Sequence, residues 1–166
     1  GEFDDAYRMG GVGPRTSPTY DDGRLYTLGA EGQLNCLDGD TGKLLWHLNI
    51  HESFETRNLM FGTCASPWVE GDALIITTGG RARGKSTLVA LNKLSGDILW
   101  EAKAGNQAYM SPFTATLAGQ KQIILGAARE MQGRSLRDGS LLWSVPWNIN
   151  YNNNISQPVV FDEQHL

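Results

Sequence analysis

One segment of the chain carries the residue types of a phosphate-binding loop. Residues 79–87 read GGRARGKST and fit G-x-x-x-x-G-K-[ST], in which backbone N–H groups and a lysine hold nucleotide phosphates. The run VVFDE at 159–163 resembles the acidic segment that holds Mg²⁺ in nucleotide hydrolases. The mechanism also requires a helix after the loop, because the phosphates rest on its N-terminal N–H groups. The following residues, STLVALNKLSG, are typical of a strand and a turn, so we interpret the match as a decoy.

The other reactive side chains are few and are poorly spaced for catalysis or metal binding. His47 and His51 lie four residues apart beside Glu52, and four residues of a continuous strand span about 13 Å, too far to share one ion. We favour two buried free thiols for Cys36 and Cys64 over a disulfide. The sequence contains no G-x-S-x-G, H-E-x-x-H or C-x-x-C motif. The formal net charge of −4 excludes a general basic footprint for nucleic acid.

The elements that must position these residues come from an internal repeat. A dipeptide ending in proline opens a short apolar run four times, at intervals of 49, 45 and 46 residues. These dipeptides begin at Ser17, Ser66, Ser111 and Gln157. Each of the first three units closes on a glycine four residues before a tryptophan. These pairs are Gly42 with Trp46, Gly96 with Trp100, and Gly139 with Trp143.

Each unit is predicted to be a four-stranded antiparallel sheet. Apolar runs of strand length alternate with turn signals such as DDG and DTG, and no helical periodicity is present. Four strands repeated every ~45 residues are typical of a β-propeller blade, so the predicted fold is an all-β propeller. The predicted blades span 17–50, 63–104 and 110–147, with 1–16 ending a preceding connection and 155–166 forming the first strand of a further blade. The chain thus holds about three and a half blades.

The repeated glycine and tryptophan each have a structural explanation. The glycine lies in the turn between the third and fourth strands, where a tight hairpin demands positive φ. Gly96→Ala is therefore expected to destabilise the fold more than its small size suggests. The tryptophan begins the outermost strand, where its indole would pack against the next blade and hold the ring together. We interpret all six residues as structural rather than as a substrate site.

The pattern A-x-D-x-x-T-G-K-x-x-W, followed by Ser-Pro, resembles the repeat of the pyrroloquinoline-quinone-type (quinoprotein-like) propellers. That family includes quinoprotein dehydrogenases, the outer-membrane β-barrel assembly lipoprotein and uncharacterised bacterial secreted proteins. The resemblance runs from Gly13 to Asp162, with Cys36 and Gly133 replacing the usual alanine that Ala90 retains. It implies a ring of seven or eight blades in a periplasmic or secreted protein.

The family resemblance does not imply a cofactor for this chain. Quinone-binding members use adjacent cysteines, a stacking tryptophan, and calcium held by acidic and amide side chains. Cys36 and Cys64 are far apart in the sequence, so the adjacent pair is missing. We expect no cofactor, with pyrroloquinoline quinone and calcium as the alternative.

The longest connections are predicted to meet on one face of the ring, called here the long-connection face. In an antiparallel blade, the connection between the second and third strands emerges on the same side as the connection to the next blade. Binding is expected there. The candidate residues are Arg57, Asn58, Arg81, Arg83, Lys85, Tyr109, Asn152, Asn153 and Asn154. The alternative is that the basic residues form a solvated turn and the asparagines terminate a loop in left-handed backbone geometry.

The function expected from these features is a non-catalytic, extracytoplasmic binding or scaffold module. Its ligand would be a protein or a small extracytoplasmic molecule, and the rest of the ring would come from the same polypeptide or from a second copy. A quinone-dependent alcohol or sugar dehydrogenase is the alternative. No run of eighteen apolar residues is present to span a membrane, and the acidic start GEFDDAYRMG does not have the character of a signal peptide.

Overall fold

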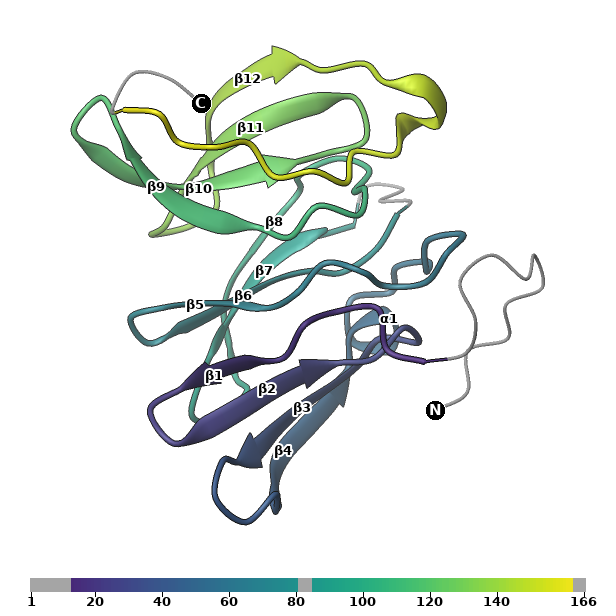
Figure 1. The fold of residues 1–166 in the computed structure, drawn as a ribbon, viewed down its shortest axis with the longest axis vertical. Helices are drawn as coiled ribbons and strands as arrows, with labels where there is room; N and C mark the ends of the chain where they lie inside the picture. Colours follow the sequence, from purple (N-terminus) through teal and green to yellow (C-terminus); the bar gives the residue numbers. More distant parts are fainter. Residues whose placement is uncertain (1–12, 81–84, 163–166) are drawn as a thin grey trace.

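The computed structural model describes residues 13–80 and 85–162, and within these ranges nearly all regular structure is strand. Twelve strands of the described part form three four-stranded antiparallel sheets (Figure 1). The first blade contains β1 (Thr19–Asp21), β2 (Arg24–Leu28), β3 (Gln33–Asp38) and β4 (Leu44–Asn49). The second contains β5 (Trp68–Glu70), β6 (Ala73–Thr77), β7 (Leu88–Asn92) and β8 (Ile98–Ala102). The third contains β9 (Phe113–Leu117), β10 (Gln120–Gly126), β11 (Glu130–Ser135) and β12 (Leu141–Pro146).

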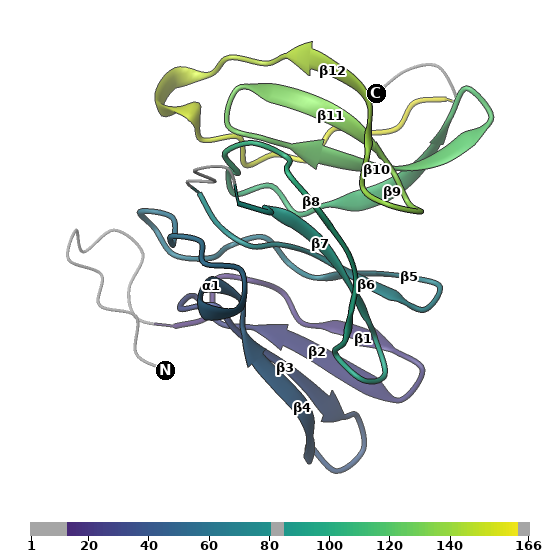
Figure 2. The ribbon, with the colours of Figure 1, turned by 180° about the vertical axis from the view of Figure 1, so that it is seen from behind.

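The three sheets stack face to face in chain order, as Figures 1 and 2 show from opposite sides. In each blade the strands are hydrogen-bonded in sequence order, so each blade is an antiparallel meander. The prediction of an all-β fold built from four-stranded propeller blades is therefore confirmed.

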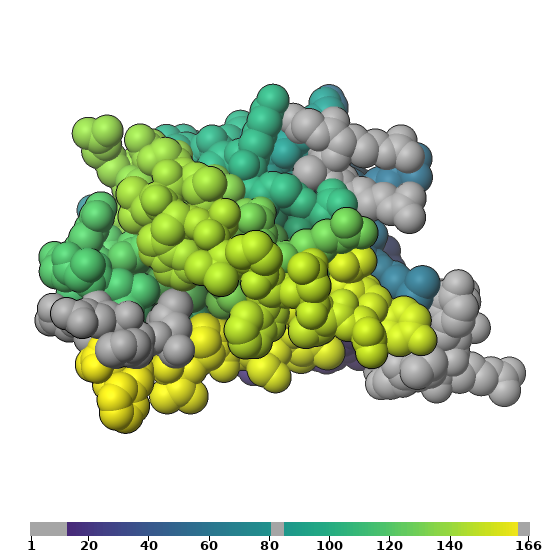
Figure 3. All heavy atoms as spheres, turned by 90° about the horizontal axis from the view of Figure 1, so that it is seen from above, coloured from purple at the N-terminus to yellow at the C-terminus, as the bar shows by residue number. Residues whose placement is uncertain are grey.

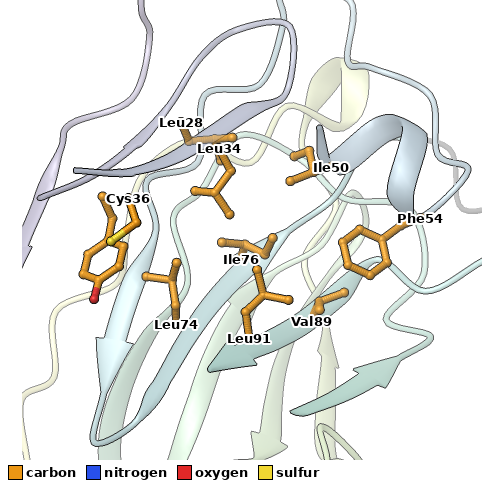
Figure 4. Close-up of a cluster of buried hydrophobic side chains, with 10 residues drawn as sticks. Leu28, Leu34, Cys36, Ile50, Phe54, Leu74, Ile76, Val89 and Leu91 are labelled. Carbon is orange, nitrogen blue, oxygen red and sulfur yellow. The ribbon is translucent and has the colours of Figure 1, made fainter. Parts of the chain in front are cut away.

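Burial along the strands follows from this stacking. In the first blade, β2 and β3 alternate between buried and half-buried residues, because the second blade covers one face. In the second blade, β6 and β7 are buried at nearly every position, because a neighbouring sheet covers each face. One apolar core, which includes Tyr26, Leu34, Leu74 and Leu91, fills the space between the first two blades (Figure 4). A second core joins the second and third blades.

Two repeated tryptophans bridge adjacent blades at the turn glycine. The indole N–H of Trp46 donates to the carbonyl of Lys93 at 3.2 Å, and that of Trp100 donates to the carbonyl of Leu136 at 3.1 Å. A Cβ added to Gly96 would lie 3.0 Å from the Trp46 ring. A Cβ added to Gly139 would lie 2.6 Å from the Trp100 ring. Glycine is thus required at these turns for two reasons: the backbone φ is positive, and the indole leaves no room for a Cβ.

The repeated Ser-Pro dipeptide also has a role between blades that the sequence did not reveal. The backbone N–H of Ser17 donates to the hydroxyl of Ser66 at 2.9 Å, and that of Ser66 donates to the hydroxyl of Ser111 at 2.8 Å. At the fourth repeat, the side-chain amide of Gln157 donates to the carbonyl of Ser111 at 3.0 Å. Hydrogen bonds therefore join the repeats just before their innermost strands.

Two sequence predictions about helices and strand ends were wrong. Residues Ile50–Ser53 form a helical turn, α1, although no helical periodicity is present. A single turn needs no periodic apolar face, and the side chain of Asn49 caps it by accepting from the N–H groups of His51 and Glu52. The tryptophan does not begin the outermost strand, because β4 starts two residues before Trp46.

The end of the described chain also differs from the sequence prediction. In the described part of 155–166, only Asp162 has a β-bridge, so the predicted first strand of a further blade does not form there. The innermost strands β1, β5 and β9 each pair with the strand that follows them in the chain, over three to five residues, whereas the bridge at Asp162 involves a single described residue of this segment. A short 3₁₀ turn, η1, covers Asn150–Asn152.

No helix of the described ranges is both long and apolar enough to cross a membrane.

Candidate functional site

The long connections lie at one end of the blades and the tight turns of the hairpins at the other (Figure 1). The long connections line one cavity of about 930 Å³. Five connections contribute to its walls: the one from β4 to β5, the one from β6 to β7, the one from β8 to β9, the one from β10 to β11, and the one that follows β12. The residues lining it are Arg57, Asn58, Leu59, Met60, Phe61, Gly80, Asn106, Gln107, Tyr109, Ala128, Tyr151, Asn152 and Asn153. Five of the nine candidates predicted from the sequence are among them.

The first wall, residues 56–61, is anchored to two blades by hydrogen bonds. The Thr56 hydroxyl donates to the carbonyl of Thr78 at 2.6 Å, and the N–H of Gly80 donates to the carbonyl of Arg57 at 3.0 Å. The amide of Asn58 donates to the carbonyl of Ala30 at 2.8 Å. The Asn58 oxygen accepts from the N–H of Leu59, so this side chain holds the wall in place on both sides. The Arg57 guanidinium has no such partner among the described residues and is exposed.

The imidazole of His51 packs behind this wall and contacts two threonine hydroxyls. Its Nε2 lies 3.2 Å from the Thr63 hydroxyl, and its Nδ1 lies 3.4 Å from the Thr56 hydroxyl. The Thr56 hydroxyl also donates to the carbonyl of Thr78, and the Thr63 hydroxyl lies 3.3 Å from the Asn58 oxygen, so the ring is held between two threonines that are themselves anchored. A Cβ on Gly32 would lie 2.5 Å from the ring, so glycine at that position makes room for His51. Burial lowers the pKa of His51 below its ordinary value.

Acidification is expected to destabilise the fold through His51. Its pKa in the folded chain is lower than in the unfolded chain, so the native state binds fewer protons. This contribution to the free energy of unfolding is fully present above the unfolded pKa of about 6.5, and it is lost as the pH falls from there through the lower pKa of the folded chain. Urea unfolding at pH 7.5 and pH 5.5 should show a smaller loss in His51→Gln than in the parent. The exposed His47 provides the control, and an unchanged loss in His51→Gln would contradict the assignment.

The second wall comes from the connection between β8 and β9. Gln107, which the sequence reasoning missed, is only 3% exposed, and its amide donates to the carbonyls of Ala104 and Gly105 at 3.0 and 3.2 Å. The ring of Tyr109 lies 5.8 Å from that of Phe61 on the first wall. Burial raises the pKa of Tyr109. The two walls therefore meet through an aromatic contact, and both of these residues line the cavity.

The three candidate asparagines have different roles. Asn152 and Asn153 line the cavity, and Asn152 has a positive φ of 56°, a conformation that asparagine tolerates. Asn154 is only 3% exposed, and its amide donates to the carbonyl of Ala127 at 2.5 Å. The carbonyl of Asn154 accepts from the N–H of Tyr109 at 3.0 Å. Asn154 thus holds the third wall, and Tyr151 projects from that wall with 90% of its surface exposed.

The basic cluster lies apart from the cavity wherever the structure describes it. Lys85 forms an ion pair with Glu55, and this hydrogen bond holds the pKa of Glu55 below its ordinary value. Arg81 and Arg83 lie outside the described residues. The next regular element after the loop is the strand β7 rather than a helix, as the decoy interpretation of the phosphate-loop pattern predicted. Arg57 is the one charged side chain among the described residues lining the cavity.

The described residues do not fit a bound quinone with calcium. Cys36 is fully buried in the first core, and Cys64 is a half-buried free thiol in the connection from β4 to β5, where burial raises its pKa. The structure thus contains no adjacent cysteine pair within the ranges it describes. In those ranges, no three His, Cys, Asp or Glu side chains gather as a metal site would require. His47, on the exposed outer strand β4, instead contacts Gln33 on β3.

Comparison with known proteins agrees with this architecture. A family model described as "Outer membrane protein assembly factor BamB" matches residues 6–164. The chain is 27% identical over 152 residues to the quinoprotein alcohol dehydrogenase PedH of Pseudomonas putida, covering 85% of this chain and 25% of PedH. It is 31% identical over 105 residues to the outer membrane protein assembly factor BamB of Xanthomonas campestris pv. campestris, covering 62% of this chain and 24% of that protein.

A solved structure supports the fold independently. The crystal structure of BamB from Moraxella catarrhalis superposes with a TM-score of 0.56 at 21% sequence identity, over 80% of this chain and 34% of that one. The chain spans about a quarter of the length of the two curated relatives. With its repeats, its three blades and the match over nearly all its length, the chain belongs to the BamB-like family of pyrroloquinoline-quinone-type β-propeller repeats.

Proposed function

We propose that the chain is a non-catalytic, extracytoplasmic binding module that presents the cavity of the long-connection face to a protein partner. The observation that carries this proposal is the convergence of five connections, distant in sequence, on one cavity of about 930 Å³. Its walls are held by buried or half-buried polar residues, while other side chains at its rim are free to contact a partner. A rigid scaffold that displays variable loops is a common way to build a binding site.

The types of the free side chains favour a protein as the partner. Tyr151 is 90% exposed, Met60 is 63% exposed, and Arg57 lies beside them in the same lining. Tyrosine, methionine and arginine are enriched at protein interfaces, and tyrosine and arginine dominate their energetic hot spots. The assembly-factor name of the BamB relatives supports a protein partner and a site outside the cytoplasm. A small extracytoplasmic ligand is the alternative occupant.

Site-specific photo-crosslinking tests this proposal. The photoreactive residue p-benzoylphenylalanine would replace Tyr151 in one variant and Thr41, in the tight turn between β3 and β4, in the matched control. In the envelope fraction of the source organism, the Tyr151 variant should give one discrete protein adduct that the control does not give. Adding Arg57→Glu should remove that adduct. Equal adducts from both faces, or none from Tyr151, would contradict the proposal.

The three blades are proposed to form part of a larger ring, completed by the same polypeptide or by a second copy. The superposed BamB chain is about three times as long as the aligned region, which supports completion by further blades. A ring of seven or eight blades would place the cavity near the rim of its central channel.

A quinone-dependent alcohol or sugar dehydrogenase is the second candidate, which the match to PedH favours. We expect no such activity, because the described residues offer neither the cysteine pair nor the metal-binding group. Adding pyrroloquinoline quinone with Ca²⁺ should leave a redox dye unreduced in the presence of simple alcohols and aldoses. Turnover above that of the quinone alone would overturn the non-catalytic assignment.

A further inference from the structure

The face of the third blade that packs against the second blade carries a buried charge. Arg134 on β11 is only 6% exposed, and Gln132 on the same strand is only 2% exposed. Counted from the residue that pairs with the repeated tryptophan, the equivalent residues of the second blade are Val89 and Leu91, which lie in the apolar core with the first blade. The same two positions are thus apolar at one junction and polar at the other.

The second blade has small side chains where these two polar residues meet it. Ala102 and Ala104 lie on its side of the junction, two and four residues after the repeated tryptophan. At the equivalent positions the first blade has Leu48 and Ile50, which fill its core with the second blade. The two alanines leave room for long side chains of the third blade to reach the main chain of the second.

The guanidinium of Arg134 joins three parts of this junction. Its Nε donates to the side-chain oxygen of Gln132 at 2.8 Å. One Nη donates at 3.0 Å to the carbonyl of Gly139, in the turn that the Trp100 indole packs against. The other Nη donates at 3.4 Å to the carbonyl of Lys103, just after β8. A planar guanidinium suits such a position, because its N–H groups point in fixed directions.

Gln132 continues these hydrogen bonds to the cavity of the long-connection face. Its side-chain amide donates to a carboxylate oxygen of Glu130 at 2.6 Å and to the carbonyl of Ala104 at 3.3 Å. The same carbonyl accepts at 3.0 Å from the side-chain amide of Gln107, which lines the cavity. Side chains of the third blade therefore hold two successive carbonyls, those of Lys103 and Ala104, where the second wall begins.

The opposite face of β11 points away from these hydrogen bonds. Gly133 lies there, and its missing Cβ leaves room for the indole of Trp143, which donates to the side-chain oxygen of Gln122 at 2.6 Å within the third blade. Figure 3 views the molecule from the side of the third blade, so the junction with the second blade lies behind the surface of that blade. Both partners of this junction are blades that the structure describes.

A buried charge is not a requirement for joining two blades, because the core between the first and second blades is apolar. Apolar side chains of similar volume often replace buried charges without loss of stability. We propose that Arg134 is a positioning residue for the cavity, which acts with Gln132 to hold the start of the second wall from inside the blade junction. The shape of the cavity then depends on a residue that does not line it. The proposal concerns this wall and does not depend on what the cavity binds.

Hydrogen exchange of the intact protein, measured by nuclear magnetic resonance, tests this role. Arg134→Met keeps a long, flexible side chain over the two alanines but removes every donor. The backbone amides of 103–107 and the side-chain amide of Gln107 should exchange at least tenfold faster than in the parent. The amides of 56–61, in the first wall, should keep the rate of the parent. Arg134→Lys should not restore the slow exchange, because an ammonium group lacks the planar fork of donors.

Leu91→Met provides the matched control, because it places the same side chain at the equivalent position of the other junction. It should leave the exchange of 103–107 at the rate of the parent. Gln132→Met removes the donor to Ala104 and should also speed exchange in this segment, so it decides the question if Arg134→Met does not fold. Unchanged exchange at 103–107 would show that these side chains only fill space and would overturn the proposal. Equal acceleration of both walls would also overturn it, because Arg134 would then support the whole junction.

Discussion

Replacing Trp100 with alanine is expected to lower the free energy of unfolding by about 3–5 kcal/mol. The substitution removes an indole that packs against the core between the second and third blades and covers the turn at Gly139. It also leaves the carbonyl of Leu136 without its indole donor. Both losses affect the junction between the second and third blades, so the packing of these two blades against each other should weaken. Chemical denaturation monitored by far-ultraviolet circular dichroism measures the effect.

Leu94→Ala, in the turn between β7 and β8, provides the control for this experiment. Its side chain is 51% exposed and belongs to neither of the two cores between adjacent blades. A surface substitution of this kind should change the free energy of unfolding by about 0.5 kcal/mol or less. Equal losses in the two variants would contradict a specific clamp at Trp100.

Gly139→Ala is expected to cost far more than Gly42→Ala, although the two glycines share one backbone conformation. Their φ values are 68° and 70°, a region where an L-residue costs about 1–2 kcal/mol. A Cβ on Gly42 meets no atom within 4 Å. A Cβ on Gly139 would lie 2.6 Å from the Trp100 ring and 2.7 Å from the Cβ of Ala102, which adds about 1–3 kcal/mol of overpacking.

The paired measurement separates backbone strain from contact between blades. Gly42→Ala reports the backbone cost alone, and the difference between the two variants reports the contact with the second blade. Gly96→Ala should fall between them, because its Cβ would lie 3.0 Å from the Trp46 ring. Indistinguishable losses at Gly42 and Gly139 would mean that no indole lies against the third turn.

The blades were predictable because their signal is repeated. Three glycine–tryptophan pairs and the spaced proline dipeptides locate the strands without any knowledge of tertiary contacts. The helical turn α1 was missed because a single capped turn has no periodicity to detect. Of the strand predicted over 155–166, the described residues show only a bridge at Asp162, since a strand also needs a hydrogen-bonded partner, which local sequence does not reveal.

The candidate site was only partly predictable, for a similar reason. Chain order and antiparallel topology place the long connections on one face, which brings Arg57, Tyr109 and Asn152 together. They do not show which side chains face the cavity and which hold its walls. Asn58 and Asn154 donate to backbone carbonyls, and neither partner lies next to them in the sequence. The support from His51 depends on the space left at Gly32, and no local pattern predicts that contact.

The third repeat shows how a departure from a pattern can be informative. Gly133 marks this unit as the poorest match to the family repeat, and the sequence alone gives no reason for this departure. The structure gives one, because the missing Cβ admits the indole of Trp143. The sequence therefore held a signal for the position of the Trp143 indole, because Gly133 and Gln122 occur together in one blade. Only the strand register shows that these two residues are close to each other.

The central claim is that a tryptophan of one blade packs its indole on the turn glycine of the next blade and so joins successive blades in order. This stacking also brings the long connections together around the cavity. The most direct test is a double-mutant cycle between Trp100→Ala and Gly139→Ala, with Trp46→Ala and Gly139→Ala as the control cycle. The account predicts that losing the Trp100 indole relieves at least about 1 kcal/mol of the Gly139→Ala cost, whereas the control pair adds within about 0.5 kcal/mol. Additive losses in the Trp100 cycle would contradict it.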